Sequence, residues 1–130
     1  MAHPNEERAR TGFEAFSSGD MDTVRDTFTD DVVWHVPGRS QLGGDYRGKD
    51  EVFSFFAKLM DLSGGTFRIE VHDILANDEH VVALTRSTAE REGRRHETKG
   101  AQVLHVNAEG KVTESWFHPD DMYADDEFWG

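Results

Sequence analysis

The sequence predicts an α+β fold in which three N-terminal helices pack on a strongly bent, mostly antiparallel sheet. Apolar residues recur at helical spacing in the first half of the chain, and after residue 66 the pattern changes to the two-residue alternation of strands. Helices and strands are therefore segregated along the chain, which is typical of α+β proteins. A length of 130 residues suits one domain. We expect residues 1–130 to form a single domain that ends in an acidic tail over 119–130.

Three segments of the first half are predicted to be helical. The first runs from Pro4 to a left-handed glycine cap at Gly19. A short second helix follows Asp20, whose carboxylate is suited to cap it. The third spans 48–62 and has a wide apolar face, so we expect it to be well buried. Between the second and third helices, residues 32–36 form a predicted strand that stops at Pro37-Gly38.

The second half is predicted to be a meander of four long strands joined by short turns. Gly100 interrupts the third of these strands, and a strand can bend at such a glycine. A bent sheet wrapped over helices leaves a cone-shaped cavity. A glycine-rich loop over 37–48 precedes the third helix, and loops of this length in compact domains are usually functional or disordered.

Composition argues against several classes of function. The formal net charge is −12, and the densest basic cluster, over 91–95, is interrupted by Glu92. We therefore expect neither nucleic acid nor an anionic membrane as a partner. The acidity favours solubility and also suits a high-salt cytoplasm. With no cysteine, no signal peptide and no apolar run of membrane-spanning length, the chain is predicted to be a soluble cytoplasmic protein without disulfides.

No motif points to nucleophilic, phosphate-binding or metal chemistry. The chain lacks G-x-S-x-G and a phosphate-binding loop, and the histidines of its second half do not follow H-x-H or H-E-x-x-H spacing. These histidines are His72, His80, His96, His105 and His118. We therefore expect no cofactor and no metal site.

Three stretches carry a resemblance to a known family: FEAFSSGDMDTVRDTFTDDVVWHVPG (13–38), YRGKDEVFSFF (46–56) and NAEGKVTESWFHPDD (107–121). With the order of elements, they resemble the nuclear transport factor 2-like superfamily and, within it, the SnoaL-like branch. Relatives there include polyketide cyclases, ketosteroid isomerase and limonene epoxide hydrolase. The resemblance implies a cone-shaped α+β barrel with a buried pocket, and usually a homodimer formed through the outer face of the sheet.

The last predicted strand matches the motif of SnoaL-like cyclases, in which an Asp four residues after a Trp acts as general acid/base. In this sequence the motif reads Gly110, Lys111, Val112, Glu114, Trp116 and Asp120. The resemblance therefore implies Asp120 as the acid/base, with the neighbouring Asp121 as the alternative. The competing interpretation is that both carboxylates lie in an exposed turn.

Two other enzymes of the superfamily fit the sequence less well. Ketosteroid isomerase uses an Asp base and an oxyanion hole made of a Tyr and an Asp. At the matching positions this chain has Val36, a nonpolar position near Phe13, and Gln102. Epoxide hydrolases need an Arg followed two residues later by an Asp, and no Asp follows Arg86 at that distance. We therefore expect neither of these two catalytic arrangements.

His35 is the second catalytic candidate, as a donor that polarises a carbonyl or as the partner of Asp120. Imidazoles titrate near neutral pH and suit either role. Strand alternation argues against His35, because it faces outward if Val36 faces the cavity. A bulge beside Pro37 would reverse that orientation.

Aromatic and polar residues elsewhere are the candidate walls of the pocket. The predicted substrate-binding residues are Trp34, Tyr46, Phe53, Phe56, Arg86, Gln102, Trp116 and Phe117. The competing interpretations are core packing for the aromatic residues and a cross-strand ion pair for Arg86. Phe128 and Trp129 are expected to pack back onto the body, onto a partner chain or over the cavity mouth, and the acidic residues before them to be solvated.

These observations predict a cofactor-independent acid/base enzyme, of the cyclase, isomerase or dehydratase-like lyase type, that acts on a small hydrophobic carbonyl compound. The alternative is a non-catalytic module of the same fold that binds a small hydrophobic ligand or serves for dimerisation. The two differ in what must face the cavity. An enzyme needs an acid or base within about 3 Å of the reacting proton, whereas a binder needs only apolar walls and a few polar anchors.

Overall fold

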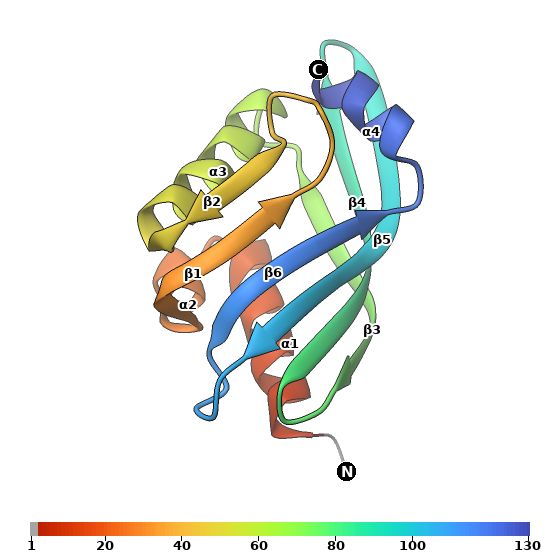
Figure 1. Ribbon diagram of the computed structural model, residues 1–130. Coiled ribbons are helices and arrows are strands. Elements are labelled where there is room, and N and C mark those ends of the chain that lie inside the picture. The colour runs from red at the N-terminus through yellow and green to blue at the C-terminus, as the bar shows by residue number, and fades with distance from the viewer. Residues whose placement is uncertain (1–2) are drawn as a thin grey trace.

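The computed structural model describes residues 3–130 as a layer of helices on one face of a curved, six-stranded sheet (Figure 1). The helices are α1 (Pro4–Ser18), α2 (Met21–Asp26), α3 (Gly48–Leu62) and α4 (Met122–Trp129). The strands are β1 (Phe28–Val36), β2 (Gly44–Arg47), β3 (Arg68–Ala76), β4 (His80–Arg91), β5 (Arg94–Val106) and β6 (Val112–Pro119). The strand order is β2-β1-β6-β5-β4-β3, and every neighbouring pair is antiparallel except β1 and β6.

The predicted α+β class, the cone-shaped arrangement and the mostly antiparallel sheet are confirmed. The sheet remains open, with β2 and β3 at its edges. The structure also adds two elements. Strand β2 lies within the predicted loop over 37–48 and pairs with β1, and helix α4 lies within the predicted tail. Strand β1 begins at Phe28, four residues before the predicted strand start at 32.

Local sequence signals account for the helix ends. Gly19 takes the left-handed conformation, with φ of 81°, at the end of α1. The side chain of Asp20 accepts a hydrogen bond from the backbone N–H of Thr23 and so caps α2. Asp121 caps α4 in the same way, by accepting from the N–H of Ala124. The carboxylate of Asp121 therefore starts α4 within the segment that was predicted to be an acidic tail.

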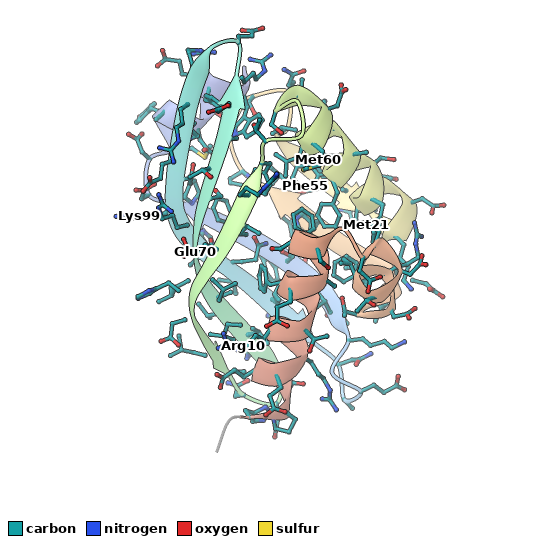
Figure 2. All side chains as sticks on the ribbon, turned by 180° about the vertical axis from the view of Figure 1, so that it is seen from behind. Arg10, Met21, Phe55, Met60, Glu70 and Lys99 are labelled. Carbon is teal, nitrogen blue, oxygen red and sulfur yellow. The ribbon has the colours of Figure 1, made fainter. Side chains whose placement is uncertain are left out.

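The curvature of the sheet creates a concave face, and the helices cover it. Figure 1 shows β4 and β5 curving together toward α4, and Figure 2, from the opposite side, shows α1 and α3 lying over the sheet. At Gly100, in the middle of β5, a Cβ atom would lie 2.6 Å from the carbonyl oxygen of His118 and 2.8 Å from the Phe117 ring. Glycine thus allows β6 and the Phe117 ring to approach β5 closely at this position.

The core lies between the concave face and the helices. Val32, Val52 and Val81 are among its most completely enclosed side chains. Tilted and edge-on contacts join the rings of Phe28, Trp34 and Phe56. No helix over residues 3–130 combines the length and the apolar character needed to cross a membrane.

Candidate functional site

A cavity of about 380 Å³ lies between the concave face of the sheet and the helices. Its walls are largely apolar. Helices α1 and α3 contribute Phe13, Phe16, Phe55, Phe56 and Leu59, and the strands contribute Phe28, Trp34, Val36, Val81, Leu104 and Phe117. The last helix, α4, closes one end of the cavity with Asp125 and Trp129. A cavity of this size and character suits a small hydrophobic molecule.

A histidine and an aspartate meet at the α4 end of the cavity. His96 Nε2 lies 2.7 Å from Asp125 Oδ1, and both side chains are only 15% exposed. The hydroxyl of Thr98 lies 2.8 Å from the same imidazole nitrogen and donates to Asp125 Oδ1 at 2.9 Å. All three residues line the cavity. We call the two titratable residues the His96–Asp125 pair, and Thr98 contacts both of them.

Two elements far apart in the sequence position this pair. Strand alternation in β5 turns His96, Thr98 and Gln102 toward the concave face. Helix α4 brings Asp125 to them, and its Phe128 stacks on the His96 ring with centroids 4.8 Å apart.

Hydrogen bonds to neighbouring segments hold α4 over the cavity. The Asp126 carboxylate accepts from the backbone N–H groups of Arg39 and Ser40, at 2.8 and 3.1 Å. The side chain of Arg91, in β4, donates to the Phe128 carbonyl at 3.1 Å. The loop after β1 and the end of β4 thus both hold the helix that carries Asp125.

The geometry of the pair fixes how the imidazole is used. A carboxylate oxygen beside Nε2 favours the tautomer in which Nε2 carries the hydrogen and donates it to Asp125. The other ring nitrogen, Nδ1, then holds the lone pair and accepts a proton. In Ser-His-Asp sites an aspartate plays the same part, by orienting the imidazole and stabilising its protonated form. An imidazole held in this way has the chemistry of a general base: it can accept a proton at Nδ1 and return it.

His35, one of the two predicted catalytic residues, lies on the outer, convex face of the sheet. Its ring stacks on Trp116, with centroids 5.3 Å apart, and hydrogen-bonds to Glu114 and Asp45 at 2.6 Å each. The hydrogen bond to Glu114, together with Asp45, raises the pKa of His35 above its usual value despite the opposing effect of partial burial. The parity argument from the sequence therefore holds: Val36 lines the cavity and His35 does not.

The other predicted catalytic residue, Asp120, is exposed where β6 ends. Its Oδ1 accepts from the backbone N–H of Lys99 at 3.3 Å, and its own N–H donates to the Lys99 carbonyl at 2.8 Å. Asp121, the alternative, is also exposed and caps α4. The structure thus places His35, Asp120 and Asp121 outside the cavity wall. Correct motif spacing did not bring these carboxylates inside, because the chain turns at Pro119 and the carboxylate that enters the cavity lies further along.

Four of the eight predicted substrate-binding residues line the cavity: Trp34, Phe56, Gln102 and Phe117. The cavity lining does not include the other four. Phe53 belongs to the aromatic cluster around Phe28 and Phe56, and the guanidinium of Arg25 lies over its ring. The Tyr46 hydroxyl donates to the Leu42 carbonyl at 2.7 Å, and its ring packs against Phe55.

Arg86 and Trp116 lie on the convex face of the sheet. Arg86 forms ion pairs with Glu70 at 3.2 Å and Glu97 at 3.0 Å. This is the cross-strand ion pair of the competing interpretation, with carboxylates on both neighbouring strands. Trp116 contacts His35 and His105. Trp34 on β1 lines the cavity, whereas Trp116 on β6 stacks on His35 on the convex face, so the two tryptophans lie on opposite faces of the sheet.

Sequence reasoning missed His96, Thr98 and Asp125 as site residues. His96 and Thr98 carry a usable signal, because both share the parity of Gln102 on the same strand. Asp125 carries none, since one acid among several in an acidic segment looks solvated until the helix is seen to fold back. Across residues 3–130, no group of three or more histidine, aspartate or glutamate side chains is arranged to hold a metal ion.

Comparisons with known proteins agree with this fold. Residues 9–115 match the model of the SnoaL-like domain. Rv0034 of Mycobacterium tuberculosis, an uncharacterised protein, is 34% identical over 122 residues, which are 92% of each chain. The structure of Bal32a, from a soil-derived mobile gene cassette, is similar with a TM-score of 0.92 and 38% identity, over 97% of this chain and 96% of that one.

More distant structures share the fold. TerC, co-crystallised with polyporic acid, has a TM-score of 0.85 at 21% identity and covers 97% of this chain and 98% of its own. IdmH of Streptomyces antibioticus, a putative polyketide cyclase, has a TM-score of 0.75 at 21% identity and covers 94% of this chain and 97% of its own. The family match spans more than half of this chain, and its arrangement of helices and sheet agrees with that match. The chain therefore belongs to the SnoaL-like domain family.

Proposed function

We propose that the protein is a cofactor-independent acid/base enzyme that acts on a small hydrophobic carbonyl compound inside the cavity. The reaction is of the cyclase, isomerase or dehydratase-like lyase type. One observation carries the proposal: an imidazole with an ordered carboxylate partner lies in the wall of a largely apolar cavity. Removing a proton from the carbon next to a carbonyl group requires a base close to that proton, in an enclosed position such as this one.

His96, Asp125 and Thr98 each have a distinct role in this reaction. His96 removes the proton through Nδ1 and returns it to another carbon or oxygen of the same molecule. Asp125 orients the ring and stabilises its positive charge after proton transfer. Thr98 donates its hydroxyl hydrogen to Asp125 and so fixes the carboxylate. Apolar walls such as Trp34 and Phe117 exclude water, which strengthens these electrostatic effects.

Two structural neighbours support this class of ligand. TerC was co-crystallised with polyporic acid, and IdmH is a putative polyketide cyclase. Both are under 25% identical to this chain, so they support the proposal through their shared fold. Function on such a fold depends on the site, and Asp125 lies beyond residues 9–115, the part that matches the family model.

The first test measures proton abstraction from a simple ketone. 2-Tetralone, which carries acidic protons beside its carbonyl, is incubated with the protein in D₂O, and loss of the α-proton signal is followed by NMR. We expect exchange faster than in matched buffer, and a fall of about 10²–10⁴-fold in the enzymic rate on Asp125→Asn or His96→Gln, the range for general acid–base catalysis. Equal exchange in wild type and both variants would refute the assignment.

A non-catalytic binding role is the second candidate, and one observation favours it. The hydrogen bonds among His96, Thr98 and Asp125 also tie α4 to β5, so they can close the cavity over a retained ligand. The same experiment separates the two roles. A binder changes the chemical shifts of 2-tetralone without accelerating exchange, whereas an enzyme does both.

A further inference from the structure

Gln102 places a buried polar group in the cavity wall, apart from the His96–Asp125 pair. It lies on β5 with only 7% of its surface exposed, and it lines the cavity. Resting on the proposed function, we infer that the substrate carries a hydroxyl group that donates a hydrogen bond to Gln102 Oε1. The substrate class is then a hydroxylated, otherwise hydrophobic carbonyl compound, with its two oxygen functions at separate ends.

The contacts of the Gln102 amide fix which atom is offered to a ligand. Its Nε2 donates to the hydroxyl oxygen of Ser115, which is completely buried, and to the carbonyl oxygen of Trp116 at 3.4 Å. An amide nitrogen has two hydrogens, so both are used. Among the residues that the structure describes, none donates to Oε1. Among the described residues, Thr85 Oγ1 is the side-chain polar atom that is both fully enclosed and without a partner. Gln102 Oε1 has no donor but is not fully enclosed, so it remains accessible from the cavity that Gln102 lines.

The surroundings make this acceptor selective. Gln102 is paired with Phe117 across β6 and with Ala83 across β4, and Leu104 follows it on the same face of β5. In such apolar surroundings an acceptor without a donor is unfavourable, and a donor from the ligand removes that cost. Sites built to hydrogen-bond a hydroxyl group discriminate strongly against analogues that lack it.

The position along β5 sets the approximate shape of the substrate. Thr98, whose hydroxyl lies 2.8 Å from His96 Nε2, is four positions before Gln102 on β5, which is about 13 Å in an extended strand. A molecule whose carbonyl end reaches His96 therefore spans roughly this length, on the order of 10 Å, before its hydroxyl meets Oε1.

The test compares the binding of two probes that differ in one hydroxyl group: 4-hydroxychalcone and chalcone. Binding is measured by quenching of tryptophan fluorescence, since Trp34 and Trp129 line the cavity. We expect the wild type to bind 4-hydroxychalcone about 5–10-fold more tightly, the gain typical of one hydrogen bond. In Gln102→Met, which keeps the volume and removes the acceptor, the two affinities should become equal while chalcone binding is retained.

Gln102→Glu is the matched variant, because a carboxylate accepts but does not donate at neutral pH. It should keep or increase the preference for 4-hydroxychalcone, and it carries the test if Gln102→Met fails to fold. An amide that presented its N–H groups to the cavity would instead lose that preference on becoming Glu. No preference in the wild type, a preference unchanged in Gln102→Met, or no binding of either chalcone would overturn the inference.

Failure of the proposed function gives a different pattern. His96→Gln should leave the hydroxyl preference intact, because the binding assay does not depend on proton transfer. A preference that depends on Gln102, without any exchange of 2-tetralone, would keep this subsite and refute the catalytic role. Normal exchange of 2-tetralone without the hydroxyl preference would support the catalytic role and refute the Gln102 subsite.

Discussion

Two histidines of this protein have similar partners and lie on opposite faces of the same sheet. On the convex face, His35 hydrogen-bonds to Glu114 and Asp45 and stacks on Trp116. On the concave face, His96 hydrogen-bonds to Asp125 and stacks on Phe128. Each is an imidazole with a carboxylate and an aromatic neighbour. Only His96 lines the cavity.

The comparison shows that a histidine–carboxylate pair is not by itself a sign of catalysis. His35 has both ring nitrogens in hydrogen bonds with carboxylates, so no nitrogen is left to act on a ligand. His96 contacts its two polar neighbours through Nε2, and no hydrogen bond to Nδ1 is formed by residues 3–130, which leaves that nitrogen for chemistry. The face of the strand and the free nitrogen together separate the two roles.

The largest expected effect is the difference in exchange rate between variants that lack one imidazole or the other. His96→Gln should lower the rate of 2-tetralone exchange by about 10²–10⁴-fold, because the general base is lost. His35→Gln should leave that rate within about twofold of wild type, since surface positions away from the site have small effects. NMR of the ketone in D₂O measures both variants under identical conditions.

Tetralone binding, followed through chemical-shift changes, serves as the control for this pair of variants. Both variants should still bind the ketone, because the apolar walls are unchanged. A larger loss of exchange in His35→Gln than in His96→Gln would reverse the assignment of the two faces.

A smaller effect on stability and on exchange is expected when α4 is held less firmly. This helix carries Asp125, the carboxylate partner of His96, and no partner of His35. In Asp126→Ala, two backbone N–H groups of the loop after β1 lose a charged acceptor. We expect a loss of about 1–3 kcal/mol in the free energy of unfolding, the range for hydrogen bonds to charged groups. Thermal and urea unfolding measure it. The exchange rate should fall too, because Asp125 is then held less firmly.

Glu127→Ala is the matched control, since it removes a carboxylate from the same helix that makes no hydrogen bond with the described residues. Its stability should stay within about 0.5 kcal/mol of the wild type. Equal destabilisation by both variants would mean that the hydrogen bonds of Asp126 do not hold the helix.

Sequence patterns predict most of the fold, and four of the eight predicted substrate-binding residues line the cavity. Periodicity identifies the helices and the long strands, because burial of one face imposes it. Parity then identifies Trp34 and Gln102 as inward-facing, since Trp34 shares a face of β1 with Val36 and Gln102 shares a face of β5 with Leu104. The same rule turns His35 outward, as the alternation of β1 indicated, and Trp116 also lies on the convex face.

The catalytic pair itself could not be predicted, because it depends on a contact between distant segments. His96 and Asp125 are 29 residues apart, and α4 brings them together. The segment that forms α4 is short and acidic, and nothing in its periodicity distinguishes Asp125 from its neighbours. The single domain, the homodimer and the cytoplasmic location implied at the outset stay predictions. Sedimentation of the purified protein is the direct measurement for the dimer.

The smallest expected effect concerns His35 and stability as a function of pH. The hydrogen bond to Glu114, aided by Asp45, raises the pKa of His35 in the folded protein above that of the unfolded chain, about 6.5. The folded state then binds this proton more tightly, so the stabilisation is fully present below about pH 6.5 and disappears as the pH rises through the folded value. Since the groups are partly exposed, it should amount to no more than about 1 kcal/mol. Wild type should therefore exceed His35→Gln in unfolding free energy most clearly near pH 6, and the gap should narrow at higher pH. A gap that widens with pH would show that the convex histidine is neutral in the folded protein.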